Sequence, residues 1–316
     1  MTGFNTTTDW FMKSKYGVFV HYLDGIQNDP GSPRGLSCGR KTSWDDCVNE
    51  FNTEIFAQQV SETGAAYAFF TVMQKTKHMC APNSTYDAYT GYKPGDACSE
   101  RDLIKDVQAS LDKRGIKLML YTTGDGPYGD ERASMGLKGG FPWNLNAEYS
   151  KRWSECMGEL SLRYGGKISG WWVDGCYKSI GFSDSTFFEN MSCALKSGNS
   201  DSIVAFNYWA GQEGYNGEVL PVTSHEDYSA GEIYQGLDNN HPYPQTRWAG
   251  DEQWHVLAFL GNDWGFPDTR YPDDFLTEYV RKCNENGGVV TLEVGLHRDG
   301  RLSEKQLKQL IRLKHK

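Results

Sequence analysis

The chain has 316 residues, enough for a single large α/β domain or barrel. Its net charge of −9 leaves no excess of cations for binding nucleic acid or anionic lipid. No apolar run approaches the ~20 residues that a membrane-spanning helix needs. Aromatic residues make up 14% of the chain, and aromatic rings stack on the C–H faces of sugars. The composition therefore favours a carbohydrate partner and argues against nucleic acid or membrane insertion; it leaves the oligomeric state open.

Short runs rich in β-branched or aromatic residues predict strands at Tyr16–His21, Ala66–Val72, Lys117–Thr122, Ile168–Asp174, Ile203–Asn207, Leu220–Ser224, His255–Leu260 and Val289–Val294. Amphipathic helices are predicted between them at Thr53–Thr63, Glu100–Arg114, Ala147–Tyr164, Ser185–Leu195, Asp273–Asn284 and Ser303–Lys314. Strands that alternate with helices favour a parallel α/β fold, here a TIM-like (β/α)8 barrel. No linker or repeat divides the chain, so we expect one catalytic domain over residues 1–316.

The ends of the predicted strands carry polar and aromatic side chains. In a parallel barrel the loops beyond the carboxyl ends of the strands meet above the packed interior, and the chemistry takes place there. The side chains at or just past these ends are His21, Tyr121, Asp174, Asn207, Glu226 and Glu293. Paired carboxyl groups with an imidazole and aromatic rings are what a glycosidase needs.

The chain shows no pattern that predicts a metal or a cofactor. It has no CxxC pair, no HExxH and no glycine-rich nucleotide loop. The even number of cysteines fits disulfides in an exported protein, with Cys38–Cys47 and Cys80–Cys98 close enough to form short loops. Isolated thiols of a cytosolic enzyme fit equally well. The compartment stays open, with a secreted or periplasmic location favoured, although the N-terminus has no signal-peptide core.

Seven segments in order carry a resemblance to a known family. They include DWFMKSKYGVFVHYL, SGWWVDG, DYSAGE, WHVLAFLGNDWGF and NGGVVTLEVGLHRDGRLSEKQ. Together they resemble the α-L-fucosidases of glycoside hydrolase family 29 almost from end to end. The resemblance implies a catalytic barrel that needs no cofactor, and a retaining mechanism. The family's β-sandwich after the barrel is not expected, because the chain stops one helix past the last strand.

The resemblance implies a role for two carboxyl groups. Asp174, in SGWWVDG, matches the nucleophile; the alternative is a carboxylate that caps the next helix or pairs with Lys178. Glu232, in DYSAGE, matches a general acid/base. The rivals for that second role are Glu226, His255, Glu293 and Glu252.

The pocket wall departs from the family pattern. The family's histidine run falls on Met73–His78, where Lys75 and His78 are the candidate replacements, and Tyr208 stands where an arginine is usual. A histidine, His255, and a glutamate, Glu293, stand where the family has Glu and Asn. The residues expected to bind substrate are His21, Tyr121, Trp172, Asn207, Glu226, His255 and Trp264.

We therefore predict a retaining glycosidase that cleaves terminal α-L-fucosyl residues from a fucosylated glycan or a fucose-containing polysaccharide. Two alternatives remain. An endo-acting fucanase, or another glycosidase on the same barrel, would explain the changed pocket wall. A carbohydrate-binding protein without activity would explain the lost histidines and arginine.

Overall fold

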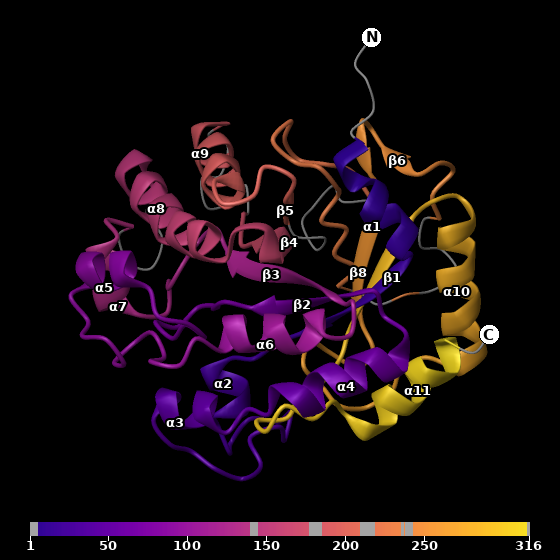
Figure 1. Cartoon of the computed structure of the whole chain (residues 1–316), viewed down its shortest axis with the longest axis horizontal. Helices are drawn as coiled ribbons and strands as arrows, with labels where there is room; N and C mark the ends of the chain where they lie inside the picture. The colour runs from indigo at the N-terminus through magenta and orange to yellow at the C-terminus, as the bar shows by residue number, and fades with distance from the viewer. Residues whose placement is uncertain are drawn as a thin grey trace.

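The computed structural model describes residues 6–139, 145–176, 185–208, 219–234, 237 and 243–314. Seven parallel strands form one curled sheet in the order β5-β4-β3-β2-β1-β9-β8 (Figure 1). Their bounds are Tyr16–Val20 (β1), Tyr67–Thr71 (β2), Lys117–Thr123 (β3), Ile168–Asp174 (β4), Ile203–Phe206 (β5), His255–Phe259 (β8) and Val289–Glu293 (β9). Nearly every residue of these strands is buried, as expected for a parallel sheet covered on both faces.

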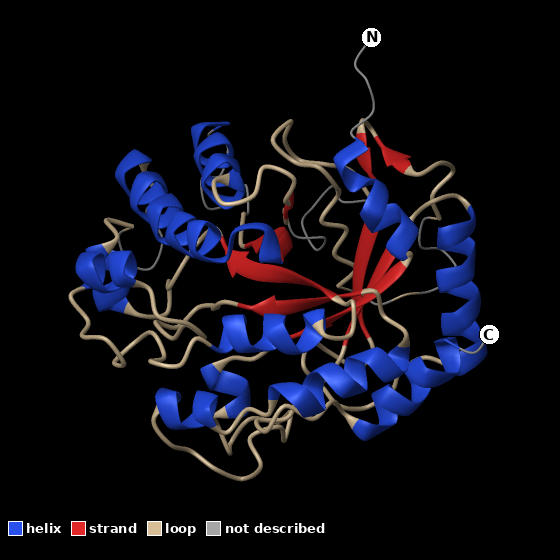
Figure 2. Ribbon diagram, in the orientation of Figure 1, coloured by secondary structure: helices blue, strands red, loops and turns tan. Residues whose placement is uncertain are grey.

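Helices surround the strands (Figure 2). The helices are Asp9–Ser14 (α1), Asp24–Gln27 (α2), Trp44–Asn49 (α3), Thr53–Thr63 (α4), Ser84–Thr90 (α5), Leu103–Asp112 (α6), Glu131–Gly136 (α7), Ala147–Tyr164 (α8), Ser185–Lys196 (α9), Asp273–Glu285 (α10) and Glu304–Lys314 (α11). Short 3-10 turns lie at Thr6–Thr8 (η1) and Gly165–Lys167 (η2), and a small antiparallel pair at Trp248–Ala249 (β6) and Glu252–Gln253 (β7).

Asparagine and aspartate side chains begin several helices. The side chain of Asn52 accepts hydrogen bonds from backbone N–H groups at the start of α4, and the side chain of Asn146 accepts one at the start of α8. The left-handed Gly64 ends α4. These are common N-cap and C-cap residues. All six predicted helices are confirmed, with bounds shifted by at most three residues.

Seven of the eight predicted strands are confirmed, and the one at Leu220–Ser224 is wrong. That segment forms bends and turns. The carboxylate of Glu226 accepts hydrogen bonds from the backbone N–H groups of Val222, at 2.7 Å, and of Thr223, at 2.9 Å. Because these donors are already used, they cannot pair with a neighbouring strand.

Residues 227–233 take the place of the predicted sixth strand. The N–H of Asp227 donates to the carbonyl of Val204 in β5 at 2.8 Å, and the N–H of Leu257 in β8 donates to the carbonyl of Gly231 at 2.9 Å. The segment thus bonds both edge strands without forming a regular strand. The described architecture is a curled seven-stranded parallel sheet with an irregular segment across its opening.

Two apolar layers pack on the sheet. The inner layer fills the curl and consists of Phe11, Phe19, Tyr67, Phe69, Met119, Tyr121, Trp172, Ile203, Ala205, Tyr228, Ala230, Leu257 and Val289. The outer layer lies between the sheet and the helices. Strand β1 shows the alternation, since Phe19 belongs to the inner layer while Val18 and Val20 belong to the outer one. The inner layer is the floor beneath the strand ends.

The structure also bears on the predictions made about disulfides and about membrane-spanning helices. All eight cysteines are free, so neither Cys38–Cys47 nor Cys80–Cys98 forms a disulfide in this structure. Within the part of the chain that is described, no helix is both long and apolar enough to cross a bilayer.

Candidate active site

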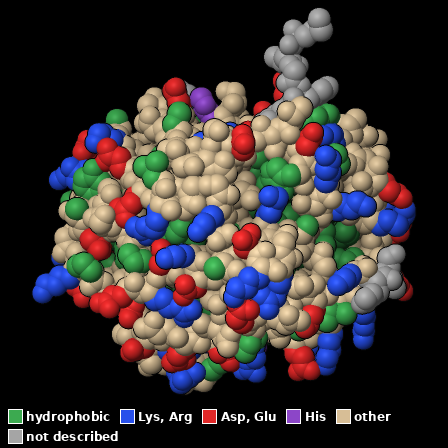
Figure 3. Space-filling model, in the orientation of Figure 1, with side chains coloured by type: hydrophobic (Ala, Val, Ile, Leu, Met, Phe, Trp, Pro, Cys, Tyr) green, Lys and Arg blue, Asp and Glu red, His purple; other side chains and the backbone are tan. Residues whose placement is uncertain are grey.

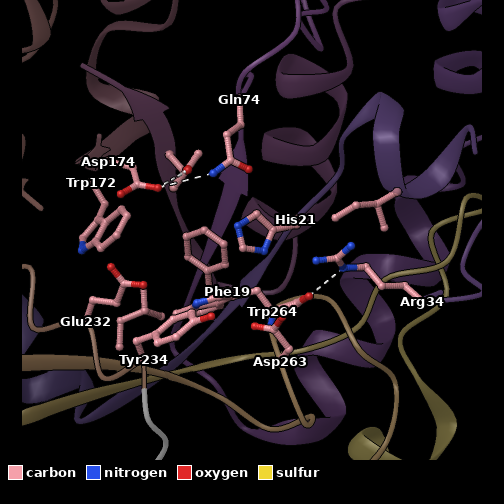
Figure 4. A pocket seen from close by; sticks show the side chains of 13 residues that line it. Phe19, His21, Arg34, Gln74, Trp172, Asp174, Glu232, Tyr234, Asp263 and Trp264 are labelled. Atoms are coloured by element: carbon pink, nitrogen blue, oxygen red, sulfur yellow. Dashed lines mark hydrogen bonds between the residues drawn. The ribbon is translucent and has the colours of Figure 1, made fainter. Parts of the chain in front are cut away.

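Asp174 is the last residue of β4, where its carboxylate leaves the edge of the sheet. The hydroxyl of Tyr121 donates to Oδ2 at 2.6 Å, and Nδ2 of Asn207 donates to Oδ1 at 2.9 Å. Nε2 of Gln74 lies 3.4 Å from Oδ2 (Figure 4). Neutral donors on both oxygens fix the orientation of the carboxylate and stabilise its charge. Lys178, the alternative ion-pair partner, lies outside the described residues.

Glu232 approaches Asp174 from the irregular segment that crosses the opening of the sheet. It is 8% exposed, and its Oε2 accepts a hydrogen bond from Asn207. The Trp264 side chain provides a second hydrogen bond. Burial raises the pKa of Glu232 to about 8, with a further contribution from the negative charge of Asp174. A carboxyl group with this pKa keeps its proton at neutral pH and is able to donate it.

One amide nitrogen joins the two carboxyl groups. Nδ2 of Asn207 lies 2.9 Å from Oδ1 of Asp174 and 2.5 Å from Oε2 of Glu232. The distance between these two oxygens therefore cannot exceed the sum of the two hydrogen-bond distances. Asn207 directly follows β5, and its backbone N–H donates to the carbonyl of Val173 in β4 at 2.7 Å. The bridging amide is thus held by the same strand pair that positions Asp174.

His21 and Glu293 form a second polar pair. Nδ1 of His21 lies 3.1 Å from Oε1 of Glu293, and the N–H of Gly265 donates to the same oxygen at 2.9 Å. Glu293 is fully buried, whereas His21 lines the pocket. Because Glu293 bonds one ring nitrogen, it fixes the ring so that the other nitrogen is available to a ligand. Glu293 therefore orients His21 and does not reach the pocket itself.

Aromatic rings form much of the pocket surface. Tyr121 and Trp172 stack with ring centroids 5.5 Å apart, and Trp264 packs 4.9 Å from Phe259. Nε1 of Trp172 donates to the carbonyl of Ala230 at 3.0 Å, which holds that ring against the irregular segment. The cavity has a volume of about 390 Å³. It is lined by Phe19, His21, Ile26, Arg34, Gln74, Tyr121, Trp172, Asp174, Glu232, Tyr234, Leu257, Asp263 and Trp264.

The structure thus brings together most of the predicted site residues, namely Asp174, Glu232, His21, Tyr121, Trp172, Asn207 and Trp264. It places Glu226 and His255 elsewhere. The carboxylate of Glu226 is occupied by three backbone N–H groups. Nδ1 of His255 lies 2.9 Å from the carbonyl of Ser229 and Nε2 lies 2.7 Å from Oγ1 of Thr291, within the fully buried inner layer. Neither residue lines the pocket.

The burial of His255 predicts a pH dependence of stability. Burial lowers the pKa of His255 to about 4, below the ordinary value of about 6.5. Between these values the unfolded chain binds a proton that the folded chain does not. Stability that is fully present above pH 6.5 is therefore lost as the pH falls toward 4, by roughly 3 kcal/mol for one proton.

We expect the H255Q variant to show a smaller fall in the free energy of unfolding between pH 7 and pH 4.5 than the parent protein. Urea titrations at each pH measure it. The matched control is H225Q, which changes a half-buried histidine on another loop. Equal pH slopes in all three proteins would contradict the assignment.

Several pocket residues escaped the sequence analysis. Within the run at Met73–His78, Gln74 reaches Asp174, whereas Lys75 and His78 do not line the pocket. The ring of His78 instead packs 5.6 Å from Trp44. Three further lining residues were not predicted and lie outside the helices and strands: Arg34, Tyr234 and Asp263. Of these, Asp263 belongs to the segment WHVLAFLGNDWGF and is next to the predicted Trp264.

A third carboxylate, Asp125, lies beside Asp174. It is buried in the loop after β3, and burial together with the charge of Asp174 raises the pKa of Asp125 well above its usual value. A Cβ on Gly175 would lie 2.5 Å from Cγ of Asp125, so the missing side chain at Gly175 makes room for it. The strand-end rule that selected Asp174 would also have selected Asp125, which lies two residues past β3.

Comparisons with known proteins give the family of the chain and the likeness of its fold to solved structures. The sequence profile of the family described as alpha-L-fucosidase matches residues 39–314. A comparison with curated protein sequences finds no match.

Three solved structures share the fold. Alpha-L-fucosidase isoenzyme 1 from Paenibacillus thiaminolyticus is 18% identical with a TM-score of 0.67, over 98% of this chain and 74% of that one. Alpha-L-fucosidase AlfC from Lactobacillus casei, in complex with its alpha-L-fucose product, is 16% identical with a TM-score of 0.63, over 98% of both chains. Endo-fucoidan hydrolase P5AFcnA, from glycoside hydrolase family 107, is 15% identical with a TM-score of 0.70, over 99% of this chain and 93% of that one. Since the family profile covers most of the sequence, the chain belongs to the α-L-fucosidase family and is a glycosidase.

Proposed function

We propose that the protein hydrolyses terminal α-L-fucosides with net retention, with Asp174 as the nucleophile and Glu232 as the general acid/base. The observation that carries this proposal is the bridge made by Asn207, which bonds a carboxylate at a strand end and a buried carboxyl group with a pKa of about 8. This reaction needs one carboxylate that attacks and a second carboxyl group that holds a proton. Family membership supports the fucosyl substrate.

In the proposed reaction Asp174 attacks the anomeric carbon while Glu232 gives its proton to the leaving oxygen. The first step forms a glycosyl-enzyme ester and releases the alcohol. Esterification removes the negative charge of Asp174, which is one of the causes of the raised pKa of Glu232. The pKa of Glu232 then falls, so the carboxylate is able to take a proton from the water that cleaves the ester.

The distance between the carboxyl groups supports retention. The bridged oxygens are no farther apart than 2.9 and 2.5 Å taken together. Retaining glycosidases place their carboxyl groups about 5 to 5.5 Å apart, whereas inverting enzymes need about 6.5 to 9.5 Å to admit water between them. Proton NMR of the first-formed anomer from 4-nitrophenyl α-L-fucoside tests this assignment. Initial formation of β-fucose would contradict it.

An endo-acting fucanase is the second candidate, and the likeness to an endo-fucoidan hydrolase favours it. Product sizes separate the two. Free fucose from the first minutes of a digest indicates exo action, and a ladder of oligosaccharides indicates endo action.

We also propose that the curled sheet is a single-domain TIM-like (β/α)8 barrel whose sixth strand is the irregular segment 227–233. Its backbone hydrogen bonds to β5 and β8 support this reading.

The pKa of Glu232 predicts the alkaline side of the pH–rate profile. The first step needs the protonated carboxyl group of Glu232, so kcat/KM is expected to fall tenfold per pH unit above a pKa near 8. Initial rates on a substrate with a poor leaving group measure this limb. The glutamine side chain of the E232Q variant cannot lose a proton in this pH range, so the residual rate should not fall above pH 8. If the rate of E232Q falls in the same way above pH 8, the group that loses a proton there is not Glu232.

A further inference from the structure

The pocket contains a cation whose position is fixed by three contacts. Arg34 lies in the connection between α2 and α3, and its Nε donates to the carbonyl of Trp264 at 2.7 Å. Its guanidinium carbon lies 5.3 Å from the ring centroid of Phe266. A Cβ on Gly265, which has a φ of +75°, would lie 2.9 Å from Cδ and Nε of Arg34. The missing side chain at Gly265 therefore lets the arginine lie against this loop.

The two terminal nitrogens of Arg34 have no protein partner among the described residues, although Arg34 lines the cavity. Most of the other described arginines form an ion pair with a carboxylate. Arg298, for example, is fully buried and donates to Glu50, Asn28 and Thr42. On the face of the molecule shown in Figure 3, basic and acidic side chains are interspersed. Arg34 is thus a positioned cation with up to four unused N–H donors at the pocket.

The two ends of the pocket differ in charge, with carboxyl groups at one end and Arg34 at the other. Figure 4 shows Asp174 and Glu232 on one side and Arg34 on the opposite side. Asp263 lines the same wall as Arg34, but its Oδ1 accepts the backbone N–H of Trp264 at 2.8 Å, and the described residues include no ion pair between it and Arg34. A sugar with its anomeric carbon at Asp174 therefore turns its far side toward the guanidinium.

We propose that Arg34 determines specificity by binding an anionic substituent, a sulfate ester or a carboxylate, on the side of the substrate remote from the anomeric carbon. The proposal rests on the proposed function, because it uses Asp174 to orient the sugar. Neutral amides such as Gln74 suffice for hydroxyl groups. Arg34 is always charged and has no ion-pair partner among the described residues, so its strongest binding partner is a group with a full negative charge. The planar guanidinium is able to donate to two oxygens of such a group.

Paired substrates test the proposal. We would measure kcat/KM for neutral 4-nitrophenyl α-L-fucoside and for analogues that carry a ring sulfate or a carboxylate, in the parent protein and in R34A and R34K. The parent protein is expected to prefer an anionic substrate roughly 10- to 100-fold. R34A should lose this preference, and R34K should recover part of it. D263N, which removes the negative charge from the same wall, should keep the preference. The substrate with the larger preference identifies the anion.

Two outcomes would overturn the proposal: a parent protein that prefers the neutral substrate, or an anionic-to-neutral ratio that is unchanged in R34A. A second measurement does not depend on turnover. Calorimetry on the D174N variant compares the binding of fucose with that of fucose sulfate, and the gain from sulfate should disappear in D174N/R34A. If no fucoside is hydrolysed but this gain is present, the proposed function fails and the anion site stands. Equal affinities for the two sugars would overturn the anion site.

Discussion

The D174N variant is expected to hydrolyse an aryl α-L-fucoside on the order of 10⁴-fold more slowly than the parent protein, or slower still. Asparagine has the size of aspartate and still accepts the hydrogen bond that Tyr121 gives at 2.6 Å. It lacks the charged oxygen that would form the ester with the anomeric carbon. Single-turnover release of nitrophenol measures the loss, and an unchanged melting temperature shows that the fold is intact.

The matched control for this prediction is D263N, which changes the other pocket aspartate on the opposite wall and should cost less than tenfold. Rescue gives a second readout. In D174G, added azide should attack the anomeric carbon in place of the carboxylate and yield β-fucosyl azide. Activity of D174N near that of the parent protein would remove Asp174 from the reaction, and with it the proposed mechanism.

The E232A variant is expected to show a loss that depends on the leaving group. For a disaccharide, whose leaving oxygen needs a proton, kcat/KM should fall about 10³- to 10⁴-fold. For a dinitrophenyl fucoside, which leaves without a proton, the first step should be nearly unaffected and the glycosyl-enzyme should accumulate. Burst kinetics with both substrates measure the difference.

Azide should restore turnover of E232A on the activated substrate and give α-fucosyl azide, the opposite anomer from that of the Asp174 variant. E252Q is the matched control, because Glu252 lies in β7 and does not line the pocket. A uniform loss on both substrates without azide rescue would transfer the acid/base role to another group.

The sequence predicted the position of Asp174 in the pocket because the signal is local. Asp174 ends a buried strand of seven residues, and the position of a strand end follows from the hydrophobic run that precedes it. The chemical partners of Asp174 were also accessible, since Tyr121 and Asn207 lie at the ends of neighbouring strands. In a parallel sheet these ends meet at one edge.

The rest of the site depends on contacts that no local pattern encodes. The run at Leu220–Ser224 has the composition of a strand, but the buried carboxylate of Glu226 accepts hydrogen bonds from the backbone N–H groups of Val222 and Thr223. Arg34 lies in a loop without periodicity and is positioned by Trp264 and Phe266, more than 200 residues later. His255 stands where the family pattern has a glutamate, yet its side chain is buried among the residues of the inner layer. Such outcomes follow from tertiary packing.

The irregular segment 227–233 has a consequence for the evolution of such enzymes. Asp174 belongs to a strand with hydrogen-bonded neighbours on both sides, so an inserted or deleted residue there would shift the pairing of the whole sheet. Glu232 lies on backbone held at a few points, where a change of length is absorbed by the adjoining loops. Among distant relatives the residue at the position of Asp174, the proposed nucleophile, should therefore keep its alignment. The residue in the role proposed for Glu232 should differ in its sequence position and be found only by superposing structures.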